Sequence, residues 1–145
     1  MPALSNVAGR EETNAEVILL DTHVLIWLAS EPARLSKKAG DAIRRASQGT
    51  GIAISAITLW ELAWLATHDR LEITGTVESF VEKISSRTAI RPVTVKVAVL
   101  ANQLPSDYSG DPCDRLIGAT ALAEGIVLVT KDIRIRVCKQ IKTIW

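Results

Sequence analysis

The feature that most constrains the fold is the alternation of short apolar runs with longer segments of helical period. Runs such as 17–20 and 126–130 are typical of strands buried on both faces, as in a parallel sheet. The segments between the runs carry apolar residues at helical spacing, and glycines such as Gly49 and Gly125 end them. Strands that alternate with helices in this way indicate an α/β layer fold with a parallel sheet.

The pattern also predicts the individual elements. Strands are expected at 17–20, 52–55, 90–93, 126–130 and 142–145. Helices are expected at 22–29, 36–47, 56–68, 77–86, 95–104 and 113–124, with a short helix from Ile133. Because Pro92 has no backbone N–H to donate, the 90–93 strand should lie at an edge of the sheet or end there.

The 145 residues suit one domain with one core. Residues 1–15 are polar and lack the apolar segment of a signal peptide, so we assign them to a flexible extension and 16–145 to the folded domain. The longest stretch without a charged residue, 46–60, is shorter than the ~18 apolar residues that a membrane span needs. We therefore expect a cytoplasmic protein without a membrane segment.

The charge balance and the cysteines exclude two further classes of protein. The chain has 17 basic and 16 acidic residues, so its bulk charge does not predict binding to nucleic acid. Cys113 and Cys138 lie far apart without the spacing of metal ligands, which argues against a zinc site. We expect both cysteines to be reduced.

Several carboxylates fall where the surrounding pattern is buried. Asp21 ends the first strand and Asp132 lies two residues past 126–130, so both should project from the carboxyl edge of the sheet, where α/β folds bind ligands. Glu61 is the only charged residue between 52 and 67, and an unpaired buried carboxylate costs several kcal/mol. The alternatives are helix capping for the two aspartates and an exposed polar strip for Glu61.

Two more acids open the helix at 113–124. Asp111 is well placed as its N-cap, with Pro112 at the first helical position. Asp114 lies in the first turn, where an acidic residue gains only ~0.3 to 1 kcal/mol from the helix dipole. This small gain explains the presence of an acid at position 114 less fully than capping explains Asp111.

Asp21, Glu61, Asp114 and Asp132 come from four elements that a parallel sheet would gather at one end. Carboxylates held close together repel unless a hard cation offsets their charge. Oxygen ligands without clustered Cys or His favour Mg²⁺ or Mn²⁺. Such sites hold one or two ions that activate water and stabilise the leaving oxygen in phosphodiester cleavage.

Four motifs follow one another along the chain: LLDTH at 19–23, SAITLWELA at 55–63, DPCDRLIGATA at 111–121 and LVTKD at 128–132. Together they resemble the successive motifs of PIN-domain ribonucleases, most of all the VapC-type toxins of prokaryotic toxin–antitoxin pairs. The resemblance covers Val17 to Trp145. It implies a three-layer α/β/α sandwich with a central parallel sheet, an endoribonuclease that depends on Mg²⁺ or Mn²⁺, a homodimer, and a cognate antitoxin that inhibits RNA cleavage.

The resemblance also implies roles for individual residues. The family's metal-binding and catalytic quartet falls on Asp21, Glu61, Asp114 and Asp132, with Asp114 in the third place ahead of Asp111. Supporting positions fall on Thr22, Asp111, Arg115 and Thr130. Two departures are Cys113, where related sequences often carry an aromatic residue, and a first acid that lies as far along the chain as position 21. Neither departure removes a metal ligand.

Other polar and aromatic residues receive weaker assignments. His23 and His68 have no Ser, Cys or Asp partner at triad spacing, so we predict neither as catalytic. A basic cluster is either a solvated helix face or a contact for the RNA backbone; it comprises Lys131, Arg134, Arg136, Lys139 and Lys142. The four tryptophans, Trp27, Trp60, Trp64 and Trp145, are expected in the core or at an interface, and those at 27, 60 and 64 are candidate antitoxin contacts.

Three other functions compete with the toxin. Dehalogenase-like phosphatases place a second Asp two residues after the first, where this chain has His23, and receiver domains need an acidic pair before their phospho-accepting Asp. A non-catalytic interaction domain is disfavoured because all four ligand positions are carboxylates. An RNA-processing nuclease of the same family remains open; a small upstream reading frame for a DNA-binding antitoxin would distinguish the toxin from it.

Overall fold

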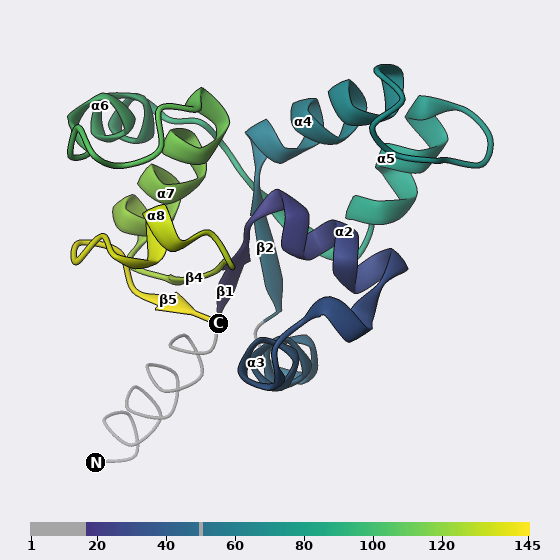
Figure 1. The fold of residues 1–145 in the computed structure, drawn as a ribbon, viewed down its shortest axis with the longest axis horizontal. Helices are drawn as coiled ribbons and strands as arrows, with labels where there is room; N and C mark the ends of the chain where they lie inside the picture. The colour runs from purple at the N-terminus through teal and green to yellow at the C-terminus, as the bar shows by residue number, and fades with distance from the viewer. Residues whose placement is uncertain (1–16, 50) are drawn as a thin grey trace, which may run out of the picture.

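The computed structural model describes residues 17–49 and 51–145, so the extension predicted at 1–15 lies outside the described residues. Within the described ranges, five strands form one parallel sheet in the order β3-β2-β1-β4-β5 (Figure 1). The strands are β1 (Ile18–Leu20), β2 (Ile52–Ser55), β3 (Thr88–Arg91), β4 (Val127–Val129) and β5 (Thr143–Ile144).

The helices follow the sequence prediction within one residue at each end. They are α2 (Thr22–Ser30), α3 (Lys37–Gln48), α4 (Ala56–Thr67), α5 (Val77–Ser85), α6 (Val95–Gln103), α7 (Pro112–Glu124) and α8 (Ile133–Arg136). A short 3₁₀ helix, η1 (Pro32–Arg34), was not predicted. Local chemistry fixes the ends: the Ser36 side chain accepts a hydrogen bond from the Ala39 amide at 3.1 Å, and Gly125 closes α7 with a φ of 64°.

The third strand is the one whose bounds were wrong by more than a residue. It was expected at 90–93, but β3 begins at Thr88 and ends at Arg91. Pro92 cannot donate to the sheet ladder, so the strand stops before it and extends at its other end. The expectation of an edge strand is confirmed, because β3 pairs with β2 at one end of the sheet order.

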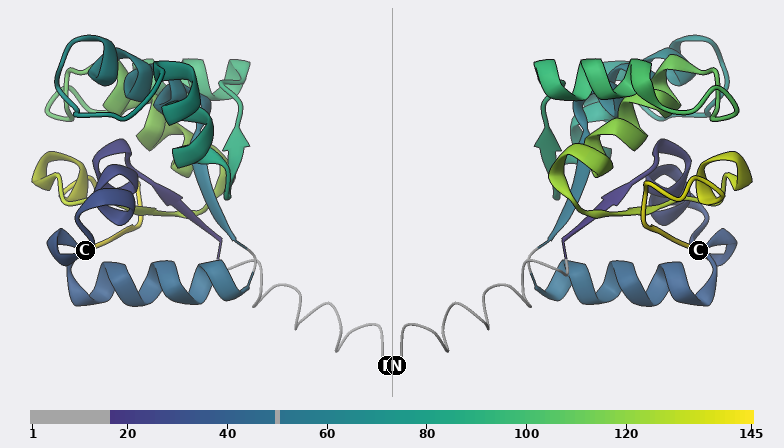
Figure 2. Two further views of the ribbon diagram at one scale, coloured as in Figure 1. Left: turned by 90° about the vertical axis from the view of Figure 1, so that its right-hand side faces the viewer. Right: turned by 90° about the vertical axis from the view of Figure 1, so that its left-hand side faces the viewer.

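Helices cover both faces of the sheet, as the alternation of side chains along β1 requires. Ile18 and Leu20 pack with residues of α2 and α3 on one face, whereas Leu19 packs with residues of α7 on the other. Figure 2 shows α3 and α7 on opposite sides of the strands. The predicted α/β/α sandwich is therefore confirmed.

The strand order places a ligand-binding edge at β1 and β4. From β1 the chain proceeds outward through β2 and β3, then crosses to β4 on the other side of β1. In open α/β sheets the crevice at such a switch point, beyond the carboxyl ends of the strands, binds ligands. Asp21 and Thr130 lie side by side there, because the Asp21 amide donates to the Val129 carbonyl at 3.1 Å.

None of the helices in residues 17–49 and 51–145 combines the length and the apolar character that crossing a membrane requires. Cys113 and Cys138 are both free thiols, and Cys113 is buried.

Candidate active site

A buried carboxylate–hydroxyl contact joins the ends of β1 and β4. Asp21, only 3% exposed, caps α2: its Oδ1 accepts from the Thr22 amide at 2.8 Å. Its Oδ2 accepts from the buried Thr130 hydroxyl at 2.7 Å. The Thr130 oxygen in turn accepts from the Asp132 amide at 3.1 Å. One hydroxyl therefore fixes the positions of two predicted site acids.

His23 also lies at this edge, although the sequence did not indicate a role for it. Its Nδ1 is 3.4 Å from Asp21 Oδ2, and its Nε2 accepts from the Lys131 amide at 3.2 Å. Because Nε2 is an acceptor, a neutral ring carries its proton on Nδ1, facing Asp21. The available sequence signal was the position of His23 in the first turn of the helix that Asp21 caps.

Glu61 on α4 presents a buried oxygen toward the same edge. Its Oε1 is inaccessible to solvent and has no hydrogen-bond partner among the described residues. Burial raises the pKa of Glu61, and the negative charges of Asp21 and Asp114 raise it further, while a contact from the Thr22 hydroxyl partly offsets the rise. Thr22 is itself held by Thr58, with 3.0 Å between their hydroxyl oxygens.

Asp114 in the first turn of α7 is the second carboxyl group whose ionisation is disfavoured. Burial raises the pKa of Asp114 to about 6, against a hydrogen bond from Ser109 that lowers it, and the charges of Asp21, Asp111 and Asp132 add to the rise. The Ser109 hydroxyl donates to Asp114 Oδ2 at 2.6 Å. Ser109 is buried, and sequence reasoning treated it only as part of a loop.

Arg115 supports this site indirectly. Its guanidinium donates to the backbone carbonyls of Ala101, Leu104 and Ser109 at 2.9, 2.9 and 3.0 Å. These three bonds hold the loop between α6 and α7, and hence the Ser109 hydroxyl that contacts Asp114. The Tyr108 hydroxyl, donating to the Asp114 carbonyl at 3.0 Å, tightens the same loop.

Asp111 acts as the helix cap that the sequence predicted. Its Oδ1 accepts from the amides of Cys113 and Asp114 at 2.7 and 3.2 Å. The side chain is exposed, but its charge still adds to the rise in the pKa of Glu61 and Asp114. Asp111 therefore shapes both the start of α7 and the charge of the site.

Asp132 caps α8 and is engaged by Arg134. Asp132 Oδ1 accepts from the Arg134 amide at 2.9 Å, and Oδ2 accepts from Arg134 Nη2 at 3.0 Å. These hydrogen bonds lower the pKa of Asp132. The same Nη2 lies 3.8 Å from Asp114 Oδ2, so one guanidinium bridges two predicted ligands.

The structure thus brings the acidic quartet near enough for its charges to act on one another. The donor set fits a hard divalent cation, because it consists of oxygens and includes a buried Glu61 oxygen without a partner. Among the described residues, however, no three Asp, Glu, His or Cys side chains are arranged so that they could hold an ion directly. Asp132 is turned toward Arg134, and Asp114 toward Ser109.

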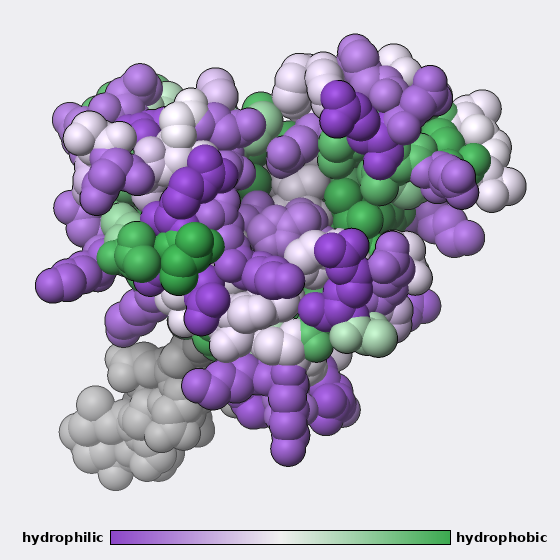
Figure 3. All heavy atoms as spheres, in the orientation of Figure 1, coloured by the Kyte–Doolittle hydropathy of each residue, from purple (hydrophilic) through white to green (hydrophobic). Residues whose placement is uncertain are grey.

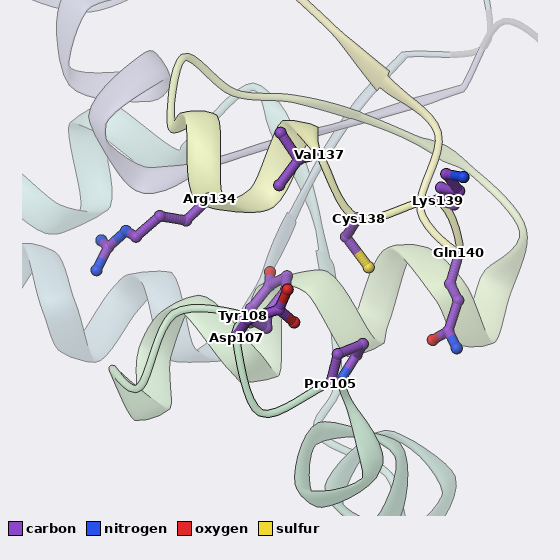
Figure 4. Close-up of a pocket in the computed structure, with 8 residues that line it drawn as sticks. All are labelled: Pro105, Asp107, Tyr108, Arg134, Val137, Cys138, Lys139 and Gln140. Atoms are coloured by element: carbon purple, nitrogen blue, oxygen red, sulfur yellow. The ribbon is translucent and has the colours of Figure 1, made fainter.

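A pocket of about 360 Å³ adjoins Arg134. It is lined by Pro105, Asp107, Tyr108, Arg134, Val137, Cys138, Lys139 and Gln140. In Figure 4 the Arg134 side chain lies at one end of the pocket and points away from Lys139 and Gln140. Figure 3 shows that the molecular face above the sheet edge is hollowed between the α7–α8 side and the α4 side.

The tryptophans divide into two groups. On α4, Trp60 is 57% exposed and Trp64 is also exposed, so this helix keeps an apolar surface facing outward. Trp27 is half-buried, packs against Trp145 with 5.9 Å between ring centroids, and lies 4.2 Å below the Arg34 guanidinium.

The amino-acid sequence is similar to that of a known family and of a known ribonuclease. Residues 18–139 match the PIN domain. The chain is 44% identical over 119 residues to Ribonuclease VapC22 of Mycobacterium tuberculosis (strain ATCC 25618 / H37Rv), covering 82% of this chain and 89% of the relative.

Two solved structures share the fold. One is VapBC2 from Rickettsia felis bound to a promoter DNA fragment, with a TM-score of 0.68 and 20% identity over 88% of this chain and 97% of the other. The second is DNA-bound VapBC from Salmonella typhimurium, with a TM-score of 0.65 and 20% identity over 88% and 96%. At 20% identity, these two matches show a shared fold and nothing about function.

Proposed function

The chain belongs to the PIN-domain family, and on this basis we propose that it is the endoribonuclease toxin of a toxin–antitoxin pair, using Mg²⁺ or Mn²⁺ to hydrolyse RNA phosphodiester bonds. The observation that supports the metal requirement is the burial of Glu61 Oε1, which has no hydrogen-bond partner among the described residues. The negative charges of Asp21 and Asp114 lie near enough to raise the pKa of this carboxyl group. A cation among these groups would offset both the burial and the repulsion.

The quartet Asp21, Glu61, Asp114 and Asp132 would hold the cation. When bound, a divalent cation supplies an activated water and stabilises the charge that develops on the phosphate. The surrounding residues position the ligands: Thr130 and His23 hold Asp21, and Ser109 holds Asp114. Burial and the neighbouring negative charges raise the pKa of Glu61 and Asp114, and a bound cation would lower both again.

The geometry disfavours the phosphotransfer alternative. A phosphatase of the dehalogenase type needs its second Asp two residues after Asp21, and that position is occupied by His23 with its ring against the carboxylate. Asp21 itself accepts hydrogen bonds from Thr22 and Thr130, which suits a fixed ligand better than a nucleophile that must reach a phosphate.

The partners follow from the same assignment. The substrate would be single-stranded or looped RNA in the cytoplasm, because the reaction needs an accessible backbone. A cognate antitoxin would cover the apolar surface of α4 that carries Trp60 and Trp64, with α2 beside it. We also propose a homodimer, supported by the exposed apolar side chains of Val95 and Val99 on α6.

Cleavage of a mixed-sequence RNA by purified protein tests the proposal. We expect cleavage with Mg²⁺ or Mn²⁺, none with EDTA, and a loss of orders of magnitude in Glu61→Gln, which removes the charge but keeps the shape. Glu78→Gln is the matched control, since Glu78 is an exposed residue of α5 outside the site. Equal cleavage with the chelator, or an active Glu61→Gln, would show that the metal mechanism is wrong.

Growth of a bacterial host tests the toxin assignment separately. Induction of the chain alone should arrest growth, and co-expression of the antitoxin should restore growth and yield a complex that purifies as one species. A chain that is harmless when expressed alone and purifies without a partner would favour the RNA-processing nuclease.

A further inference from the structure

Arg134 occupies a position that the proposed cation would need. Its Nη2 contacts the Oδ2 atoms of both Asp132 and Asp114, at 3.0 and 3.8 Å. Asp132 Oδ1 accepts from the Arg134 amide that starts α8 and from Arg134 Nε, at 2.9 and 3.3 Å. The guanidinium therefore serves as the counter-ion of two predicted ligands.

The contact can be broken at small cost, because the Arg134 side chain is 58% exposed and rises from the four-residue helix α8. Exposed ion pairs contribute little stability, and water can replace their hydrogen bonds. A divalent cation carries twice the charge of a guanidinium and coordinates the same kind of oxygen more closely. The cation would therefore displace Arg134 from the acids.

A displaced guanidinium would still lie close to the sheet edge at which the proposed reaction takes place. Arg134 also lines the pocket that contains Lys139, and this part of the chain is basic on its exposed side. Guanidinium groups bind phosphate through paired N–H donors and hold their charge at every physiological pH. The RNA backbone is the phosphate-bearing ligand that the proposed reaction brings to this edge of the sheet.

We propose, on the basis of the function argued above, that Arg134 exchanges partners during the catalytic cycle. Without metal it pairs with Asp114 and Asp132 and offsets part of their charge; once a divalent cation binds, it turns outward and holds an RNA phosphate next to the scissile bond. Arg134 is in this sense a positioning residue whose RNA contact depends on the metal. The exchange reduces the repulsion between two of the acids in the absence of metal and couples substrate binding to metal binding.

The first test is metal affinity without RNA. Mn²⁺ binding to Arg134→Gln and Arg136→Gln is measured by the electron paramagnetic resonance of free Mn²⁺. Arg136 is matched to Arg134 because it lies on the same helix, is exposed, and forms no ion pair in the part of the chain that the structure describes. We expect the Kd to fall about threefold to tenfold in Arg134→Gln and less than twofold in Arg136→Gln.

The second test is RNA affinity with and without metal, using a fluorescent single-stranded RNA and Ca²⁺ in place of Mg²⁺, with the RNA checked for integrity. Arg134→Gln should weaken binding in Ca²⁺ and make the slope of log Kd against log salt smaller by about 0.7, as expected for one lost phosphate contact. In EDTA the same substitution should have little effect, because Arg134 is then held by the acids.

The outcomes separate this inference from the proposed function. An unchanged or weaker Mn²⁺ affinity in Arg134→Gln, or an equal loss of RNA affinity in Ca²⁺ and EDTA, would overturn the exchange even if the wild type binds Mn²⁺ and cleaves RNA. A wild type that neither binds Mn²⁺ nor cleaves RNA would overturn the proposed function, and the exchange with it.

Discussion

The substitution Asp114→Asn distinguishes a metal ligand from a helix-start residue. The change keeps the shape of the side chain and the acceptor for the Ser109 hydroxyl, but removes a charge that burial and three neighbouring carboxylates disfavour. If Asp114 belongs to a carboxylate cluster, the metal-free protein should become more stable when this charge is lost. If it only decorates α7, stability should fall slightly.

The magnitude follows from the pKa of Asp114. A rise from an ordinary value of 3.8 to about 6 in the folded protein is worth about 3 kcal/mol, at 1.36 kcal/mol per pKa unit. The loss of a favourable first-turn charge subtracts about 0.3 to 1 kcal/mol. We therefore expect metal-free Asp114→Asn to be about 2 kcal/mol more stable than the wild type near pH 8.

The pH dependence has a definite sign. Because the pKa of Asp114 is higher in the folded than in the unfolded state, its stabilising contribution is complete below about pH 4 and is lost as pH rises through about 6. The difference between the two proteins should therefore be small at pH 4 and grow toward pH 8. Urea unfolding in EDTA across this range measures it, with Glu78→Gln, an exposed residue of α5 outside the site, as a control of equal charge.

Metal should reverse the order of stability. Mn²⁺ at 100 times its Kd stabilises a folded protein by about 2.7 kcal/mol, and Asp114→Asn should gain much less. Two results together would refute the reasoning. Mn²⁺ would leave the melting temperature of the wild type unchanged, and Asp114→Asn would be less stable at pH 8 and still cleave RNA. Asp114 would then be a helix-start residue only.

Two further substitutions test how the site is held together. Thr130→Val removes the hydroxyl that contacts Asp21 and the Asp132 amide, so we expect a loss of about 3 kcal/mol in urea unfolding and weaker Mn²⁺ binding, both largely restored in Thr130→Ser. In Gly118→Ala the new Cβ would collide with the Tyr108 ring and hydroxyl, costing about 1–3 kcal/mol; Gly40→Ala on α3, where a Cβ meets no described atom within 4 Å, should leave stability equal or slightly higher.

The elements of the fold were predictable because their signals are local. Apolar periodicity located the helices and strands, and caps such as Ser36, Asp111 and Gly125 set their ends. Parallel strands also made it predictable that Asp21 and Asp132 would meet at one edge. The bounds of β3 were misplaced because the apolar residues around Pro92 suggested a strand there. Pro92 has no N–H to donate to the sheet, so the strand ends at Arg91.

The contacts that position the acids were not predictable, because they depend on how loops and helices are placed relative to one another. Ser109 contacts Asp114 from a loop that Arg115 holds by donating to carbonyls of α6 and of the loop itself, 6 to 14 residues earlier in the chain. Arg134 could be recognised as basic but not as the partner of Asp114, since that contact requires α7 and α8 to be placed in space. His23 was missed because its ring lies between Asp21 and the Lys131 amide, and the contact with Lys131 requires the ends of β1 and β4 to lie side by side.

The most direct test of the account is the location of a bound cation. Crystals of the protein grown or soaked with Mn²⁺ would be measured at a wavelength where Mn²⁺ scatters anomalously. We predict a peak about 2.1 Å from carboxylate oxygens of the quartet formed by Asp21, Glu61, Asp114 and Asp132, with Arg134 turned away from Asp114. A peak elsewhere, or none at the quartet under conditions in which the same protein cleaves RNA, would contradict it.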